Sequence, residues 1–250
     1  MSLTKTRGVV LRGTNLKEAD RILEIYSDQL GKVRAVAKGV RKIKSRLAGH
    51  LEPFTYVDLM FAQGRGDLPT VTGAKALEHF AGLRRNLKAV AAASYLAELV
   101  GRLTPDGQAS RRFPTLLRAA LRALDAGHDP KQIVSYYEWQ AVGVAGWEPS
   151  LRTCASCHQQ LFPQGLSFSV SLGGVLCRDC RVHDPSGRPV SPEAVKLLRQ
   201  YAERPFAEVE GLLVGDGVRA ETAGLTELIV HITLEREPKS RSFLRHVEAV

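Results

Sequence analysis

The chain has 250 residues, of which 44% are hydrophobic and 24% are charged, so it is long enough for more than one core and is not wholly disordered. Its formal net charge of +9 favours a polyanionic partner, either nucleic acid or an anionic membrane surface. The membrane class loses support, because the first ten residues contain no apolar signal core and the most apolar stretch, residues 89–100, is too short to span a bilayer. We expect no membrane partner and a cytoplasmic protein with reduced cysteines.

Residues 1–80 are predicted to form short strands. Alternating apolar positions indicate strands at residues 6–12, 21–27, 32–38, 54–61 and, more weakly, 70–77. Turn compositions separate them at Asp28-Gln29-Leu30-Gly31 and Gly64-Arg65-Gly66-Asp67. Five short strands with a longer polar connection between the third and the fourth favour a small closed barrel of OB type. An SH3-like barrel gives a similar pattern, and periodicity does not separate the two.

Residues 81–250 are predicted to form a helical domain. Helical spacing of apolar residues covers 83–103, 113–124, 131–144, 194–201 and 226–235, and a charged tail follows at 236–250. Asp129 is the expected N-cap of the third helix, with Pro130 at its first position. The chain is therefore expected to be a multidomain α+β protein, with a barrel at 1–80 and a helical domain at 81–250. A cysteine-bearing module is inserted in the helical domain at about residues 150–185.

The four cysteines form two Cys-x-x-Cys pairs separated by 19 residues: Cys154, Cys157, Cys177 and Cys180. This spacing is typical of a four-cysteine zinc site, in which each pair forms a knuckle and the glycine-containing segment between the pairs forms a hairpin. Four thiolates leave no open position for a substrate, so the spacing predicts one structural zinc ion. Two disulfides, a redox Cys-x-x-Cys or unrelated core cysteines are the alternatives. His158 and His183 are neighbouring alternative ligands, although surface histidines are the simpler interpretation.

The positive charge is concentrated in the predicted barrel, where 14 Lys and Arg residues against 8 Asp and Glu residues give +6 of the total +9. Seven of the residues from 32 to 46 are basic and none is acidic: Lys32, Arg34, Lys38, Arg41, Lys42, Lys44 and Arg46. Because alternate side chains of a strand share a face, the strand cations are predicted to face solvent while Val33, Ala35 and Ala37 face inward.

Aromatic side chains are predicted on the same solvent side of the barrel. The alternation places Tyr26 with Glu24, and Phe54 and Tyr56 with Asp58. OB barrels bind single strands by combining a positive groove with aromatic rings that stack on bases. We therefore predict a DNA-binding ridge made of the seven basic residues with Tyr26 and Tyr56. The alternative interpretation is a solvated basic face without a partner.

No catalytic motif accompanies these features. The sequence has no glycine-rich phosphate loop followed by Lys-Ser/Thr, and His50, His79 and His231 are isolated. We therefore predict a binding protein and not an enzyme. One rival is a zinc-stapled adaptor whose basic face binds an acidic protein, which tight, salt-dependent binding of a labelled oligonucleotide would argue against. Another is a nuclease, which needs a metal-binding carboxylate cluster that the sequence does not reveal.

Four segments of the barrel region carry a family resemblance: Thr6-Arg7-Gly8-Val9-Val10-Leu11-Arg12, Glu18-Ala19-Asp20-Arg21-Ile22-Leu23, Gly31-Lys32-Val33 and Ala37-Lys38-Gly39-Val40-Arg41. With the helices and the four-cysteine module that follow, the chain resembles the RecO family of bacterial recombination mediators over essentially its whole length. Some members of that family lack the zinc module.

The resemblance implies an OB fold that binds single- and double-stranded DNA and anneals complementary strands. It also implies action with RecR, the two proteins together helping to load RecA onto DNA covered by the single-strand DNA-binding protein, and hence a place at the nucleoid. Of the basic residues, the resemblance carries over only Lys38 and Arg41.

A protein-docking role for the helical part is a further expectation from the resemblance, which implies that this part binds the acidic tail of the single-strand DNA-binding protein. Beyond residue 80 the chain has 21 basic and 18 acidic residues, so it is nearly neutral there. Arg118 and Arg122 are candidates for the carboxylates of that tail, because a guanidinium group bonds carboxylate oxygens in pairs. The simpler interpretation is that both lie on a solvated helix face.

Overall fold

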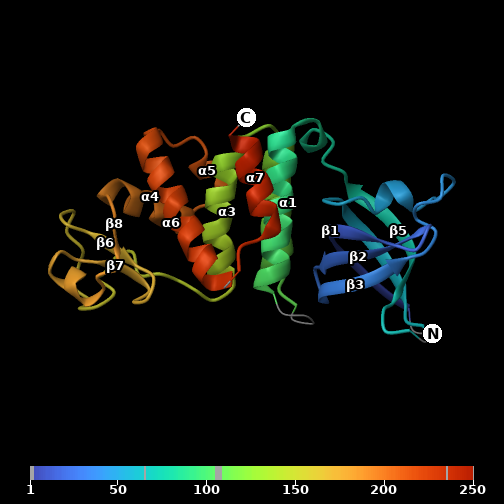
Figure 1. The fold of residues 1–250 in the computed structure, drawn as a ribbon, viewed down its shortest axis with the longest axis horizontal. Coiled ribbons are helices and arrows are strands. Elements are labelled where there is room, and N and C mark those ends of the chain that lie inside the picture. The colour runs from blue at the N-terminus through green and yellow to red at the C-terminus, as the bar shows by residue number, and fades with distance from the viewer. Residues whose placement is uncertain (1–2, 65, 105–108, 235, 250) are drawn as a thin grey trace. The chain divides into compact units, whose positions relative to one another are not determined.

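The computed structural model describes residues 3–64, 66–104, 109–234 and 236–249. The chain forms two compact units, one comprising Met1–Pro130 and Pro238–Val250, the other comprising Lys131–Glu237. In sequence, the second unit is therefore an insertion in the first. The predicted boundary at residue 80 marks the change from strands to helices, and the helices that directly follow the barrel belong to its unit (Figure 1).

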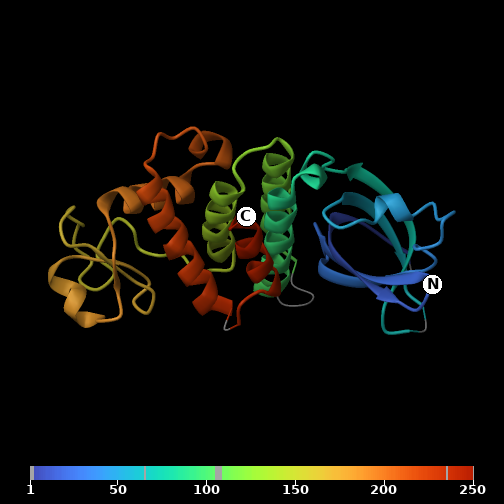
Figure 2. The ribbon, with the colours of Figure 1, turned by 45° about the horizontal axis from the view of Figure 1, so that its top comes forward.

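Five strands form the N-terminal barrel: β1 (Leu3–Leu16), β2 (Asp20–Ser27), β3 (Gly31–Ala37), β4 (Tyr56–Ala62) and β5 (Thr70–Glu78). The barrel is closed in the order β1-β2-β3-β5-β4. Neighbouring strands are antiparallel except β3 and β5, which meet in parallel at Val36 and Thr70. This five-stranded order confirms the predicted OB-type barrel. Figures 1 and 2 show the barrel in blue and cyan.

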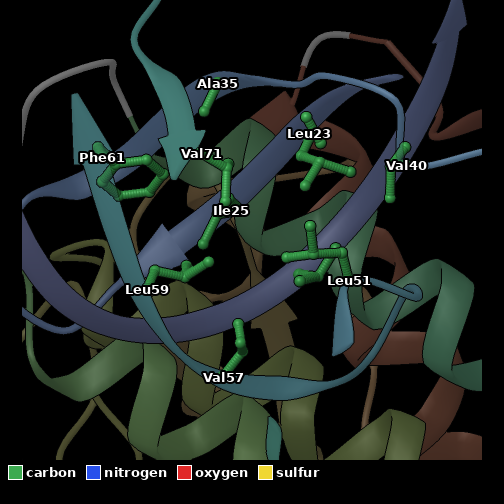
Figure 3. Close-up of a cluster of buried hydrophobic side chains, with 11 residues drawn as sticks. Leu23, Ile25, Ala35, Val40, Leu51, Val57, Leu59, Phe61 and Val71 are labelled. Carbon is green, nitrogen blue, oxygen red and sulfur yellow. The ribbon is translucent and has the colours of Figure 1, made fainter. Parts of the chain in front are cut away.

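The barrel core consists of the inward-facing side chains of alternate strand positions. Leu23 and Ile25 of β2 meet Leu59 and Phe61 of β4 and Val71 of β5 inside the barrel (Figure 3). Ala35 and Ala37 also belong to this core, and Val33 packs partly against it. The predicted phase of the third strand is therefore confirmed.

Strand β1 is long enough to pair with two neighbours. Its first part pairs with β4 and its later part with β2, with an irregularity between Val10 and Arg12. Where the two pairings meet, a Cβ atom on Gly8 would lie 2.4 Å from the carbonyl oxygen of Tyr26. Glycine is therefore required at this close approach of two backbones.

Among the described residues, the first unit also contains the helices α1 (Leu87–Leu103), α2 (Arg112–Asp125) and α7 (Lys239–Glu248). The short 3-10 helices η1 (Ala48–His50) and η2 (Leu83–Arg85) precede β4 and α1. The first predicted helix started at residue 83, but α1 begins at Leu87. The reason is that the Asn86 side chain caps it by accepting hydrogen bonds from the backbone N–H groups of Lys88 and Ala89, at 2.9 and 3.3 Å.

Helix α7 occupies most of residues 236–250, the charged tail for which we predicted no helix of its own. Its Leu244 and Val247 are buried, and the helix packs along α1 (Figures 1 and 2). The Glu98 carboxylate of α1 accepts hydrogen bonds from the backbone N–H groups of Lys239 and Ser240, at 3.1 and 2.9 Å. An acidic group placed at a helix N-terminus satisfies N–H groups that have no partner within the helix.

In the described part of the second unit, helices combine with a small sheet. The helices are α3 (Pro130–Val144), α4 (Pro192–Glu203), α5 (Phe206–Val209) and α6 (Asp216–Leu234). The strands β6 (Ser167–Ser169), β7 (Gly174–Leu176) and β8 (Arg188–Pro189) form a sheet in the order β7-β6-β8, and the 3-10 helix η3 (Asp179–His183) lies between β7 and β8.

Helix α6 begins ten residues before the predicted start at residue 226. Its early turns contain Gly217 and Gly224, which weaken the helical signal in the sequence, but Thr222 and Leu225 are buried and extend the packed face. The predicted last residue, Glu235, lies outside the described residues. Among the described helices, none combines the length and the apolar character needed to cross a membrane.

Candidate nucleic-acid interface and metal centre

A polar bracket fixes the start of the basic loop that follows β3. The Asp20 carboxylate accepts a hydrogen bond from the backbone N–H of Gly39 at 2.7 Å. The backbone N–H of Arg41 donates to the carbonyl of Ala19 at 3.0 Å, and its guanidinium group donates to the carbonyls of Lys17 and Glu18. The turn between β1 and β2 therefore holds the loop in place, and the Glu18-Ala19-Asp20 segment has a structural role.

The loop continues through two tight turns and returns to the barrel. The N–H of Lys42 donates to the carbonyl of Gly39 at 3.1 Å, and the N–H of Ser45 donates to the carbonyl of Lys42 at 2.9 Å. Val40, within the first turn, is buried in the barrel core, and Leu47, after the second turn, packs against that core. The backbone of the loop is consequently ordered before any ligand arrives.

The loop directs its cations into solvent. The exposed basic side chains of the loop are those of Lys38, Arg41, Lys42, Lys44 and Arg46. Arg34 of β3 is also exposed, opposite Glu24 of β2. Glu24 accepts two hydrogen bonds from Arg12, at 3.0 and 2.7 Å, so its charge is already matched. We call Arg34 and the five loop cations the loop surface.

Lys17 adds a cation that sequence reasoning missed. It lies exposed in the turn between β1 and β2, and its backbone φ is 56°, a value that residues other than glycine rarely adopt. Its carbonyl oxygen accepts a hydrogen bond from the Arg41 guanidinium group, so Lys17 is next to the loop surface. A single lysine outside the basic run gave no signal in the sequence, because only the bracket brings the turn and the loop together.

Lys32 lies away from the loop surface, which corrects its assignment to the predicted ridge. Its ammonium group donates to the carbonyls of Gly101 and Thr104 at 2.8 and 3.0 Å. These carbonyls are at the C-terminal end of α1, where a cation is favoured. The strand phase correctly turns Lys32 away from the barrel core, but at this end of β3 a helix covers the outer face.

Tyr26 and Tyr56 are buried, so the prediction that they face solvent is wrong. Tyr26 has 0% exposure and packs edge-on against Phe113 of α2, with ring centroids 6.0 Å apart. Tyr56 is 5% exposed, and its hydroxyl donates to Asp28 at 2.7 Å. Burial, together with Asp28, raises the pKa of Tyr56. Phe54 is also buried. Helix α2 covers this part of the outer barrel face, so neither tyrosine is available for stacking on a base.

Arg118 and Arg122 bind within the unit. Arg118 pairs with Glu78 of β5, and the Arg122 guanidinium donates to the same carboxylate at 2.6 and 2.9 Å. Burial raises the pKa of Glu78, but the two guanidinium groups outweigh burial and hold it below its usual range. The Arg118 guanidinium also lies 3.6 Å from the Tyr56 ring centroid. Both arginines therefore fasten α2 to the barrel, so the two candidates for binding the carboxylates of an acidic tail are already paired with an internal carboxylate.

The four cysteines converge on one point in the second unit. The Sγ atoms of Cys154, Cys157, Cys177 and Cys180 all lie within 4.8 Å of one another, and none of the four is in a disulfide. Four thiolates around a tetrahedral metal at roughly 2.3 Å are about 3.8 Å apart, close to the 4.0 Å between Cys157 and Cys177. The cluster is therefore able to hold a metal ion.

The surroundings of the cluster shift the pKa values of two of its thiols in opposite directions. Burial raises the pKa of the Cys154 thiol, but backbone N–H groups of Cys157, Cys177 and Ser156 outweigh burial and lower it to about 6. The N–H of Cys177 lies 3.4 Å from Cys154 Sγ. Burial raises the pKa of Cys180 to about 12. His158 and His183 are not part of the cluster, and His183 instead contacts the Ser156 hydroxyl at 2.8 Å.

A second polar node holds the strands beside the cysteines. The Asp184 carboxylate accepts hydrogen bonds from the hydroxyls of Ser171, at 2.9 Å, and Ser186, at 2.5 Å, and from the backbone N–H of Ser186 at 3.0 Å. Hydroxyl hydrogen bonds from Ser169, Ser186 and Ser171 lower the pKa of Asp184 to about 2. The node connects the β6–β7 turn to the segment after η3, which keeps the hairpin and the second cysteine pair together.

Two family models match the chain, one described as Recombination protein O N terminal over residues 1–80 and one as Recombination protein O C terminal over residues 84–242. The chain belongs to the RecO family. The DNA repair protein RecO of Dehalococcoides mccartyi (strain ATCC BAA-2266 / KCTC 15142 / 195) is 35% identical over 240 residues, which cover 96% of this chain and 94% of the relative. That of Roseiflexus sp. (strain RS-1) is 39% identical over 244 residues, which cover 97% and 85%.

Membership of the RecO family identifies the chain as a non-catalytic DNA repair protein and recombination mediator. The DNA repair protein RecO of Bifidobacterium adolescentis, 36% identical over 253 residues, matches 98% of this chain and 100% of the relative. The four segments that carried the resemblance in this RecO chain include both sides of the bracket. Asp20 and Ala19 come from one segment, and Gly39 and Arg41 from another.

Proposed function

We propose that the chain binds DNA through the loop surface and uses this binding to mediate recombination. It binds single- and double-stranded DNA, anneals complementary strands and, with RecR, helps to load RecA onto DNA covered by the single-strand DNA-binding protein. The observation that supports this function best is the loop surface itself, where Arg34 lies beside five exposed loop cations whose backbone is fixed at both ends. A preordered set of charges binds phosphates without the cost of ordering the loop.

The proposed binding is electrostatic and independent of sequence. Phosphate contacts fix position but carry no base information. If five to seven cations contact phosphates, a plot of log K against log salt has a slope of roughly −3 to −5 on single strands. Because Tyr26 and Tyr56 are buried, aromatic stacking by these two residues does not contribute.

The test compares two triple variants of the full chain with the same loss of charge. Lys38→Gln, Lys42→Gln and Lys44→Gln together remove loop charges that have no ion-pair partner among the described residues. Arg85→Gln, Lys88→Gln and Arg112→Gln remove three exposed charges near α1 and α2. Electrophoretic binding of single and double strands at several salt concentrations should show a flatter slope only for the loop variant. A flatter slope in the second variant alone would relocate the DNA site.

The metal that we propose for the cysteine cluster is a single zinc ion. Four sulfur ligands in a compact arrangement, with Cys154 and Cys180 buried, suit Zn²⁺, which favours tetrahedral thiolate coordination. With all four positions taken by protein, zinc would stabilise the fold and would not activate water. Elemental analysis of protein purified without chelator should give one zinc per chain, and no zinc would reject this assignment.

Docking of the acidic tail of the single-strand DNA-binding protein remains a separate proposal for the helical part. The near neutrality of residues 81–250 supports it, whereas the engagement of Arg118 and Arg122 with Glu78 removes those two as its anchors. Titration of a fluorescent tail peptide into the full chain already saturated with oligonucleotide tests it. Binding that survives saturation supports a site apart from the loop surface. Complete displacement by DNA would place the peptide on that surface.

A further inference from the structure

An apolar side chain stands at the outermost turn of the loop surface. Ile43 has a relative exposure of 104%, so it makes no packing contact that the fold depends on. It occupies a central position of the turn in which the N–H of Ser45 donates to the carbonyl of Lys42, at 2.9 Å. Its chain neighbours are Lys42 and Lys44. Single exposed apolar residues are common on protein surfaces, so the position of Ile43 is more informative than its exposure.

The loop geometry determines where Ile43 would meet a bound strand. Lys42 and Lys44, on either side of Ile43, would contact phosphates of the bound strand. The Ile43 side chain between them would then face the bases of the same nucleotides. Because the turn is held by the Gly39 and Lys42 carbonyls and by the buried Val40, Ile43 does not fold back onto the barrel. An apolar side chain kept in water by a fixed backbone gains free energy when a ligand covers it.

We infer that Ile43 inserts between neighbouring bases of the bound single strand and partly unstacks them. Apolar side chains inserted between base steps are an established way to deform nucleic acid, and unstacking a single strand breaks no base pairs. The inference rests on the proposed function, because it requires DNA on the loop surface. It assigns a base contact to the loop surface, because the predicted stacking residues Tyr26 and Tyr56 are buried elsewhere on the barrel. It also gives the loop surface a preference for bases that are not yet paired.

The test uses three single variants of the full chain. Ile43→Ala removes the wedge, and Ile43→Leu keeps an apolar side chain of the same volume. Leu213→Ala is the matched control, because Leu213 is equally exposed, at 104%, but lies in the second unit. None of these changes removes a buried group, so all three should fold like the parent chain. The probe is a single-stranded oligonucleotide containing 2-aminopurine, whose fluorescence increases when the base is unstacked.

The expected result separates Ile43 from the cations. Ile43→Ala should weaken binding by about fivefold to tenfold at every salt concentration, with an unchanged salt slope, because an apolar contact releases no counterions. At saturation, the 2-aminopurine signal should rise with the parent chain and with Ile43→Leu, and should fail to rise with Ile43→Ala. Leu213→Ala should match the parent chain in both measurements.

Two outcomes overturn the inference and differ in what they imply for DNA binding. If Ile43→Ala keeps full affinity and the full fluorescence rise while the triple lysine variant flattens the salt slope, DNA lies on the loop surface and Ile43 does not contact the bases. If neither the lysine variant nor Ile43→Ala changes binding, the DNA site is elsewhere, and the proposed function of the loop surface fails with the inference.

Discussion

Asp20 and Gly39 are joined by a hydrogen bond of 2.7 Å from the glycine N–H to the carboxylate, across 19 residues of sequence. Gly39 has a φ of 64°, a left-handed conformation that glycine adopts at little cost and that turns the chain away from β3. The carboxylate therefore fixes the place where the strand ends and the loop surface begins. Asp20 is acidic, yet its position supports a cationic surface.

Replacing Asp20 tests whether order in the loop matters beyond charge. Asp20→Ala and Asp20→Asn both raise the net charge by one, but only the asparagine keeps an oxygen that accepts from Gly39. We expect Asp20→Ala to bind oligonucleotides roughly fivefold more weakly than Asp20→Asn, because about 1 kcal/mol of loop ordering then accompanies binding. Fluorescence anisotropy at one salt concentration measures the difference. Equal affinities, or a tighter alanine variant, would show that charge alone decides.

Replacing Lys32 distinguishes a helix cap from a DNA contact. Lys32→Met keeps the length of the side chain but loses the hydrogen bonds to the carbonyls of Gly101 and Thr104. We expect the free energy of unfolding to fall by about 1–2 kcal/mol, with an unchanged salt slope for DNA binding. Arg34→Gln, on the same strand, should leave the free energy of unfolding unchanged and flatten the salt slope. Urea unfolding and salt titration of both variants decide the matter, and a flatter slope in Lys32→Met would return this residue to the DNA surface.

Loss of one cysteine should affect the second unit and leave the barrel intact. Cys177→Ser removes one of four ligands, so we expect loss of bound metal, local unfolding around β6 and β7 and a lower midpoint of thermal unfolding. DNA affinity should fall less than in the triple lysine variant. His158→Ala is the control. Because His158 is not part of the cysteine cluster, this variant should retain the bound metal. Metal content and DNA affinity are measured for both variants. Loss of metal in His158→Ala, with metal retained in Cys177→Ser, would show that the histidine is a ligand in place of the cysteine.

The attachment of α7 should weaken in acid. Burial raises the pKa of Glu98, but the hydroxyl and N–H groups of Ser240 and the N–H of Lys239 outweigh burial and lower it. A carboxyl group with a lowered folded-state pKa stabilises the fold fully above its ordinary pKa, and this contribution is lost as the pH falls through the folded value. Glu98→Gln should therefore cost about 0.5–2 kcal/mol at pH 7, as for a lost cap.

Hydrogen exchange of residues 239–248 in the parent chain and in Glu98→Gln, compared at each pH, measures this effect. The difference between the two proteins should be largest at neutral pH and should shrink below the ordinary carboxyl range, about pH 4. A difference that stays constant down to pH 3 would mean that the charge of Glu98 is not what holds α7.

Local patterns in the sequence predicted the barrel and the cysteine cluster, because both are encoded within short segments. The alternation of Leu23 and Ile25 indicates a strand wherever that strand pairs. The two Cys-x-x-Cys pairs each form a knuckle from neighbouring residues, and the metal-binding geometry follows from their spacing.

The errors arose where a distant element covers a face. Strand phase correctly put Tyr26 and Lys32 on the outer side of the barrel, but phase does not reveal that α2 and the end of α1 cover that side. The same limit applies to α7. Leu244 and Val247 have apolar neighbours only when the segment lies on α1, whose Glu98 is 142 residues away from Ser240 in sequence. Periodicity in a charged segment of ten residues gives little sign of such a contact.

The position of α7 at the end of the chain also affects the order in which the chain folds during synthesis. Domains generally fold from the N-terminus as they emerge. Here the barrel, α1 and α2 emerge early, but the helix that completes their unit follows the whole of residues 131–237. Until α7 has been synthesised, the side of α1 that packs against it remains exposed. The second unit can fold during this time, so the last step of folding is the return of α7 to a helix synthesised well before it.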